Sequence, residues 1–366
     1  MNSEVDPVDV LAPWGPAGPP PAGQWSDDVL GPGFQAMTLN LLPDDEPPTV
    51  ATLVHYLPAA DPKFKGEAPT PRCQLLYLHG RNDYFFHDEF ARKLAGMGVE
   101  LYALDLRKYG RSLRQGQTIG YVTDLDDYDE EIGQALEIIG HELPLLLMGH
   151  STGGLLAALW AYRHPEFLSG LVLNSAWLEL QSLASMRPAA QQLVRRVAAR
   201  HPKTTVFPSH GDLYGPSILE GWNGSGLDIP EYLDPEDPAV TGWPIATQWK
   251  RPESYPAPAA WLEAIMDAQE QVQKHMKIDC PVLSFASTGS GHAGVWSPDV
   301  FGTDVVLDAQ VIVDRSAHLA DCVTIVRLPG KHDLLLSDGP VREKLYWHLQ
   351  QWLDAFVLSS PNVAGD

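Results

Sequence analysis

Basic residues and cysteines are scarce in this chain of 366 residues. Lys and Arg number 25 against 47 Asp and Glu, which gives a net charge of −22 at pH 7. An acidic surface of this strength repels phosphate backbones and anionic lipids, so we expect no nucleic-acid partner. The three cysteines, Cys73, Cys280 and Cys322, are widely spaced and form no CxxC pair. Such a set is typical neither of a disulfide framework nor of a cysteine zinc site.

Long apolar runs are absent as well. The longest of them, such as residues 145–148 and 155–160, are far too short to cross a bilayer. The first thirty residues contain no Lys or Arg and no apolar segment typical of a signal peptide. We therefore expect a cytoplasmic protein with no integral membrane segment.

The organisation of the chain follows from changes in composition. Residues 1–33 are rich in Pro, Gly and Ala and are expected to form a tail. From about residue 34, short apolar β-rich runs alternate with amphipathic helical patterns, which predicts an α/β fold with a mostly parallel sheet flanked by helices. The expected strands are residues 52–56, 74–78, 100–104, 145–148, 170–173, 282–285 and 323–328.

This alternation stops between residues 177 and 258, where loops dominate. An insertion between two strands of such a sheet usually lies over the carboxyl ends of the strands, where ligands bind. We therefore divide the chain into a tail (1–33), a first core part (34–176), a cap insertion (177–258) and a second core part (259–366).

The strongest chemical motif is Gly-His-Ser-Thr-Gly at residues 149–153. It follows an apolar strand directly and precedes a good helix start. This strand–turn–helix context is that of a nucleophile elbow, in which the serine stands at the tip of a sharp turn. Gly149 and Gly153 flank it where side chains would collide. The pattern predicts Ser151 as a nucleophile.

A serine nucleophile needs a base, because its hydroxyl is hardly ionised at neutral pH. In the elbow fold the order along the chain is serine, acid, histidine. Of thirteen histidines, His332 has the expected place, between a late β-rich run and the last amphipathic helix. His79 is expected to support a neighbouring turn, and His292 and His318 precede the last strand.

The acid that orients this histidine is expected after the preceding strand. The first carboxylates there are Asp299, Asp304 and Asp308, of which we choose Asp304, with Asp308 as the runner-up. Asp308 has a structural explanation at the start of a helical segment, where a carboxylate favours the helix dipole. Asp333 adjoins His332, and the side chains of adjacent residues diverge.

Two backbone N–H groups are expected to form an oxyanion hole. One belongs to Thr152, after the nucleophile, and the other to Arg81 in the loop after an earlier strand, with Asn82 as the alternative. Residues 289–294 match G-x-G-x-x-G, but Trp-Ser-Pro at 296–298 breaks the helix that a dinucleotide fingerprint requires. No spacing typical of metal ligands is found. We expect neither a cofactor nor a metal.

His79-Gly80, the run D-L-R-K-Y-G-R-S at residues 105–112 and the serine motif resemble the α/β-hydrolase superfamily. Within it, the sequence is similar to the serine aminopeptidase and lysophospholipase-like branch, which includes monoacylglycerol lipases. Lys108 replaces the first Gly of that branch's D-x-R-G-x-G-x-S segment. The resemblance covers about residues 50–176 and 259–358. It implies an α/β-hydrolase fold, a triad of Ser151, Asp304 and His332, and oxyanion donors at Arg81 and Thr152.

The expected function is hydrolysis of a small carboxylic ester through an acyl-enzyme. A cap rich in Trp and Leu favours a lipophilic acyl group, such as that of a monoacylglycerol or lysolipid. A C–C bond hydrolase, a thioesterase or a peptidase would use the same triad and stays open. A non-catalytic binding protein on this fold is a different class, and the intact triad speaks against it.

Overall fold

A nine-stranded, mostly parallel sheet lies at the centre of the molecule. The computed structural model describes residues 9–180, 187–207, 212–274 and 276–359. The sheet contains β1 (Ser26–Asp27), β2 (Phe34–Asn40), β3 (Val50–Tyr56), β4 (Cys73–Leu78), β5 (Val99–Asp105), β6 (Leu145–His150), β7 (Gly170–Asn174), β10 (Val282–Ser287) and β11 (Val323–Leu328). A separate small pairing joins β8 (Thr205–Phe207) to β9 (Ala257–Pro258).

The strand order is β1-β2-β3-β5-β4-β6-β7-β10-β11. The pairings from β1 to β5 are antiparallel, and those from β5 to β11 are parallel. Every strand expected from the sequence is present, and the mostly parallel α/β sheet is confirmed. Strand β2 was not predicted from the sequence. Most of its residues are buried, and buried and exposed positions do not alternate strictly along it.

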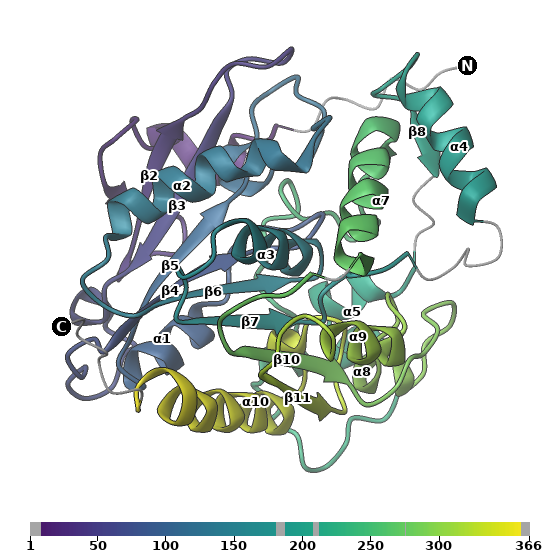
Figure 1. Cartoon of the computed structure of the whole chain (residues 1–366). Helices are drawn as coiled ribbons and strands as arrows, with labels where there is room; N and C mark the ends of the chain where they lie inside the picture. The colour runs from purple at the N-terminus through teal and green to yellow at the C-terminus, as the bar shows by residue number, and fades with distance from the viewer. Residues whose placement is uncertain (1–8, 181–186, 208–211, 275, 360–366) are drawn as a thin grey trace.

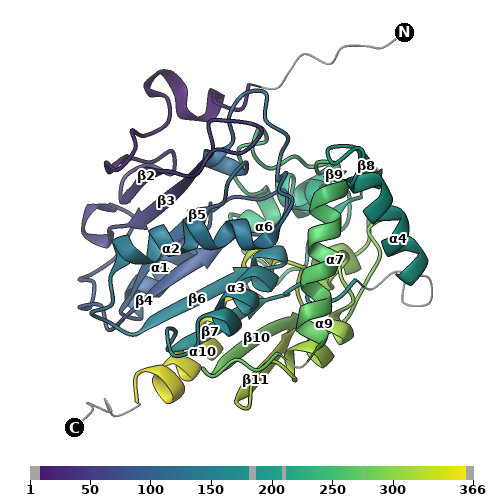
Figure 2. The same cartoon turned by 45° about the horizontal axis from the view of Figure 1, so that its top comes forward.

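Helices cover both faces of this sheet (Figure 1). The helices are α1 (Asp88–Gly96), α2 (Tyr128–Ile139), α3 (Thr152–Arg163), α4 (Arg187–Ala198), α5 (Tyr214–Leu219), α6 (Pro238–Thr241), α7 (Ala259–Gln273), α8 (Asp299–Gly302), α9 (Ala309–Ser316) and α10 (Gly339–Trp352). Among them, α2, α3 and α7 pack in one hydrophobic cluster with Leu76 and Leu78 of β4. Helices α1 and α10 pack in the other with Leu75 and Tyr77. Figure 2 shows the two layers from a second direction.

The segment expected to form a tail is packed against the sheet over its described part, residues 9–33. Strand β1 pairs with β2, and the buried ring of Trp14 lies 5.6 Å from that of Trp249. Asp28 accepts two hydrogen bonds, at 2.7 and 2.8 Å, from the buried guanidinium of Arg111. Composition could not reveal this, because the ion pair joins residues that are 83 positions apart.

The insertion between β7 and α7 borders the pocket that contains Ser151, the predicted nucleophile. Its helix α4 packs on α7, while α5 and residues 245–254 border the pocket that contains Ser151. Residues 181–186 and 208–211 of this insertion lie outside the described residues. Among the described helices, none has the length and apolar character needed to cross a membrane.

Candidate active site

Ser151 stands at the sharp turn between β6 and α3. Its backbone has φ 52° and ψ −116°, a conformation that residues with a side chain rarely adopt. A Cβ on Gly149 would collide with the backbone of Gly153, and a Cβ on Gly153 would collide with the carbonyl oxygens of Leu78 and His79. The two glycines are therefore needed where β6, α3 and the loop after β4 approach one another.

His332 and Asp304 meet although they are 28 residues apart in the chain. Nδ1 of His332 lies 2.8 Å from Oδ2 of Asp304, and both side chains are buried. The other carboxylate oxygen accepts hydrogen bonds from the backbone N–H groups of Val306 and Leu307 at 2.9 and 2.7 Å. These bonds fix the carboxylate, which in turn orients the imidazole.

The second ring nitrogen of His332, Nε2, is not used by the contact with Asp304. Within the described part of the chain, Nε2 is buried and has no hydrogen-bond partner. His332 and Ser151 line the same pocket. This nitrogen is therefore available to a hydroxyl group, as a general base requires, and such bonds often form only when substrate is bound.

The runner-up, Asp308, and the neighbour of the histidine, Asp333, have different partners. Asp308 caps α9 and accepts hydrogen bonds from the N–H groups of Gln310 and Val311 at 2.9 and 3.3 Å. Asp333 accepts one from Asn174 at 2.7 Å and pairs with Nε2 of His87 at 2.9 Å. Of these acids, the structure thus brings Asp304 to the ring of His332.

Arg81 and Thr152 both lie at the pocket that contains Ser151. Thr152 is the first residue of α3, where no carbonyl four residues earlier can accept its N–H. Within the described residues, neither the backbone N–H of Thr152 nor that of Arg81 donates a hydrogen bond. His79 supports the same loop, because its Nε2 accepts a hydrogen bond from the N–H of Leu106 at 3.0 Å.

The pocket beside Ser151 has a volume of about 330 Å³. Its lining combines apolar and cationic residues. The apolar side chains are Trp177, Tyr214, Ile218, Ile245, Pro252, Val306 and Leu307, and the cationic residues are Arg81, Lys250 and Arg251. The insertion therefore supplies much of the wall, while the loops after β4, β6 and β11 supply Arg81, Ser151 and His332.

A buried ionic network beneath the serine was not foreseen from the sequence. Asp83 accepts a hydrogen bond from the ammonium of Lys250 at 2.7 Å, and its other oxygen lies 3.5 Å from Nδ1 of His150. The same nitrogen lies 3.9 Å from Asp333, which binds His87. No local motif signals this network, because its members come from four separate regions that only the fold brings together.

Lys250 and the neighbouring histidines lower the pKa of both carboxylates. Burial alone would raise the pKa of Asp83, but Lys250 and His150 outweigh it and hold that pKa well below its usual range. Burial of Asp333 is opposed in the same way by His150 and His87, which hold its pKa far below the ordinary value. Both groups therefore remain charged at neutral pH.

Three members of this network are also close enough to ligate one cation. Within the described residues, one ligand atom from each of Asp83, His150 and Asp333 lies within 4.8 Å of the others. However, the ammonium of Lys250 already lies 2.7 Å from Asp83, and a metal ion there would be next to this like charge. The chemistry of this set therefore fits an internal ion-pair network better than a metal site.

The fold and the elbow define an α/β hydrolase. The family model described as serine aminopeptidase, S33, matches residues 69–289, which is more than half of the chain. The chain therefore belongs to this family. Among solved structures, a soluble variant of monoglyceride lipase from Saccharomyces cerevisiae matches with a TM-score of 0.56 and 16% identity, over 87% of this chain and 96% of that one.

Sequence relatives match over shorter stretches. Monoglyceride lipase from Mus musculus is 30% identical over 110 residues, which are 29% of this chain and 35% of the relative. Proline iminopeptidase from Saccharolobus solfataricus is 28% identical over 157 residues, 41% of this chain and 47% of the relative. The matched segments thus span about a third to a half of these relatives' lengths.

Proposed function

We propose that the protein is a serine hydrolase that cleaves a carboxylic ester through an acyl-enzyme. The observation that carries this proposal is the buried 2.8 Å contact between His332 and Asp304 at the pocket that also contains Ser151. The similarity of a stretch of 110 residues to a monoglyceride lipase supports an ester as the substrate.

In the proposed reaction, Oγ of Ser151 attacks the ester carbonyl while Nε2 of His332 takes its proton. Asp304 holds the Nδ1–H of the ring and stabilises the imidazolium that forms. The N–H groups of Arg81 and Thr152 donate to the carbonyl oxygen as it gains negative charge. His332 then protonates the leaving alcohol, and water hydrolyses the acyl-enzyme by the same route in reverse.

We propose in addition that residues 177–258 act as a cap that shapes the acyl pocket. Ile218 and Ile245 from this segment line the pocket, so a lipophilic acyl group would contact them. The proline iminopeptidase match keeps a peptidase with the same residues as a second candidate.

A panel of 4-nitrophenyl esters and aminoacyl 4-nitroanilides tests the proposal. We expect turnover of the esters that is abolished by Ser151→Ala and by His332→Ala. Cleavage of the anilides in preference to the esters would favour the peptidase, and ester turnover that persists in Ser151→Ala would overturn the assigned nucleophile.

A further inference from the structure

Arg81 has a side chain whose charge the protein leaves uncompensated. It lines the pocket that contains Ser151 and remains partly buried. Its guanidinium donates one hydrogen bond to the carbonyl oxygen of Tyr255 and lies over the ring of Trp261, 5.2 Å from the centroid. Within the described residues, no carboxylate pairs with it, and burial lowers its pKa.

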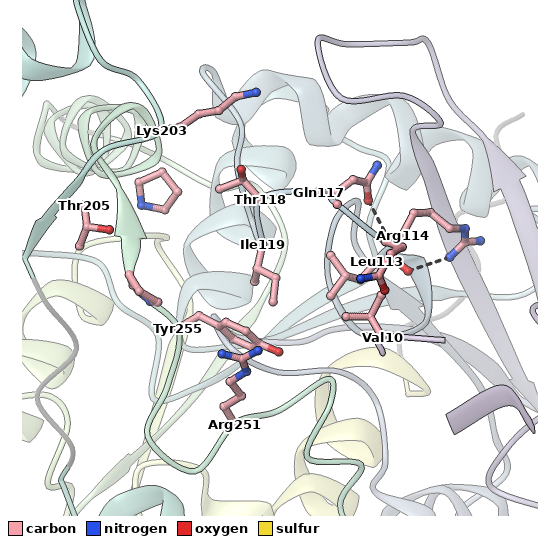
Figure 3. Close-up of a pocket in the computed structure, with 14 residues that line it drawn as sticks. Val10, Leu113, Arg114, Gln117, Thr118, Ile119, Lys203, Thr205, Arg251 and Tyr255 are labelled. Carbon is pink, nitrogen blue, oxygen red and sulfur yellow. Dashed lines mark hydrogen bonds between the residues drawn. The ribbon is translucent and has the colours of Figure 1, made fainter. Parts of the chain in front are cut away.

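Arg251 adds a second guanidinium to the same wall. It borders both the pocket beside Ser151 and a neighbouring pocket of about 380 Å³. Figure 3 shows its guanidinium against the ring of Tyr255, and the two lie 4.3 Å apart. In the described part of the chain this group, too, has no carboxylate partner. The backbone of Arg251 is fixed by two hydrogen bonds with the side chain of Asn82, at 2.9 and 3.1 Å.

The other charged residues at this pocket offset these two charges only in part. Lys250 is paired with Asp83 at 2.7 Å. Asp212, which also lines the pocket, is exposed and accepts a hydrogen bond from the N–H of Tyr214 at 3.0 Å. With Lys250 paired and Asp212 opposing one of the two Arg charges, the pocket lining keeps an excess of positive charge in a molecule with a net charge of −22.

A guanidinium that is removed from water without an acidic partner is costly, and a ligand can supply the missing partner. Resting on the proposed function, we infer that the ester substrate carries an anionic group, a carboxylate or a phosphate, which Arg81 and Arg251 bind. The planar fork of Arg suits both groups through paired N–H···O bonds. The apolar residues of the same pocket would receive the uncharged part of the substrate.

Two pairs of esters that differ in charge test the inference and locate the anion. On the acyl side, 4-nitrophenyl hydrogen glutarate is compared with 4-nitrophenyl valerate, in which a methyl group replaces the carboxylate. On the alcohol side, 1-octanoylglycerol 3-phosphate is compared with 1-octanoylglycerol. We expect kcat/KM to be about tenfold or more higher for the anionic member of one pair, since a charged hydrogen bond is lost in the neutral member.

Charge-removing variants connect this preference to the two residues. Arg81→Gln and Arg251→Gln are each expected to lower the ratio of anionic to neutral turnover by about tenfold. Arg114→Gln is the matched control, because Arg114 also lacks an acidic partner in the described residues but lies in the neighbouring pocket and bonds to the carbonyl of Arg111 at 2.7 Å. The control should keep the ratio of the unmodified protein.

The outcomes separate this inference from the proposed function. Turnover of the neutral esters reports on the hydrolase itself. Equal or better turnover of the neutral member in both pairs would overturn the inference alone, as would an anion preference that survives both Arg variants. A readout without turnover is calorimetry on Ser151→Ala, with monomethyl glutarate against methyl valerate and 1-octanoylglycerol 3-phosphate against 1-octanoylglycerol. The anionic member of one pair should bind more tightly than its neutral partner, and equal or weaker binding of the anionic member in both pairs would contradict the inference.

Discussion

The chemistry of the site depends on single residues, and the role of Asp304 can be tested most directly. Asp304 and Asp308 lie on one short segment. Asp304 contacts His332, whereas Asp308 caps α9. We predict that Asp304→Asn lowers kcat by about 10⁴-fold, as the equivalent change does in serine proteases. Asp308→Asn should cost at most about 1 kcal/mol of stability and little activity.

The control for this prediction is built into the pair, because both variants are Asp to Asn on the same segment. Steady-state kinetics and thermal unfolding on both variants are sufficient. An inactive Asp308→Asn beside an active Asp304→Asn would reverse the assignment.

Lys331, next to His332, is a buried amine that the proposed reaction does not use. Its ammonium position is bonded to the hydroxyl and carbonyl oxygens of Ser217 at 2.7 and 3.1 Å, and burial lowers its pKa to about 7. The ordinary lysine pKa is about 10.4, so the unfolded chain binds more protons between about pH 7 and pH 10. The free energy of unfolding should therefore rise with pH across that window. Below about pH 7 the amine is protonated in both states, and the full cost of burying its charge lowers the free energy of unfolding.

We predict that Lys331→Met removes this rise. Denaturant unfolding at several pH values measures the free energy of unfolding of the unmodified protein and of the variant. The difference between these two free energies should change by up to about 1.4 kcal/mol per pH unit between pH 7 and pH 10. Parallel curves for the two proteins would show that Lys331 does not titrate in this range.

Lys108 is a position at which the sequence departs from the family's D-x-R-G-x-G-x-S segment. Lys108 replaces a glycine of the family's segment and has φ 60°, a conformation that favours glycine. Its buried ammonium lies 2.6 Å from Asp44 and 4.7 Å from the ring of Tyr121. The sequence reveals the substitution, but these compensating contacts come from other loops and could not be read from it.

At the scale of elements, the insertion and the loop after β4 are joined by three successive residues of that loop. Arg81 bonds to the carbonyl of Tyr255, Asn82 to the backbone of Arg251, and Asp83 to Lys250. The loop that follows β4 is thus held by the segment that follows α6. A substitution in this segment should therefore alter the position of the loop after β4, which borders the same pocket as Ser151.

Two ion pairs of the same length allow a matched test of this connection. Lys250 lies 2.7 Å from buried Asp83, and Lys277 lies 2.7 Å from highly exposed Asp321. Lys250→Met should cost about 3 kcal/mol of stability, because it leaves a buried carboxylate with one partner fewer. Lys277→Met should cost less than about 1 kcal/mol. Similar small losses for both variants in denaturant unfolding would contradict the role of the buried pair.

The elements themselves were largely predictable from the sequence. Apolar runs bounded by turns located the parallel strands, and the glycines around Ser151 located the elbow, because both signals are local. The packing of residues 9–33 was not predictable, since it depends on the contact between Asp28 and Arg111. The network of Asp83, His150 and Asp333 was missed for the same reason.

At the scale of the whole molecule, the parallel sheet gathers at one edge the groups that the chain keeps far apart. Ser151 follows β6, Asp304 comes after β10, and His332 follows β11. The order serine, acid, histidine thus becomes a compact site because the carboxyl ends of these parallel strands meet there.

The central claim is that this arrangement activates Ser151 and no other serine. Treatment with a fluorophosphonate probe followed by peptide mass spectrometry measures this directly. The account predicts a single adduct on the peptide that contains Ser151, lost in Ser151→Ala and strongly slowed in His332→Ala. An adduct on a different serine, or no adduct on the folded protein, would contradict it.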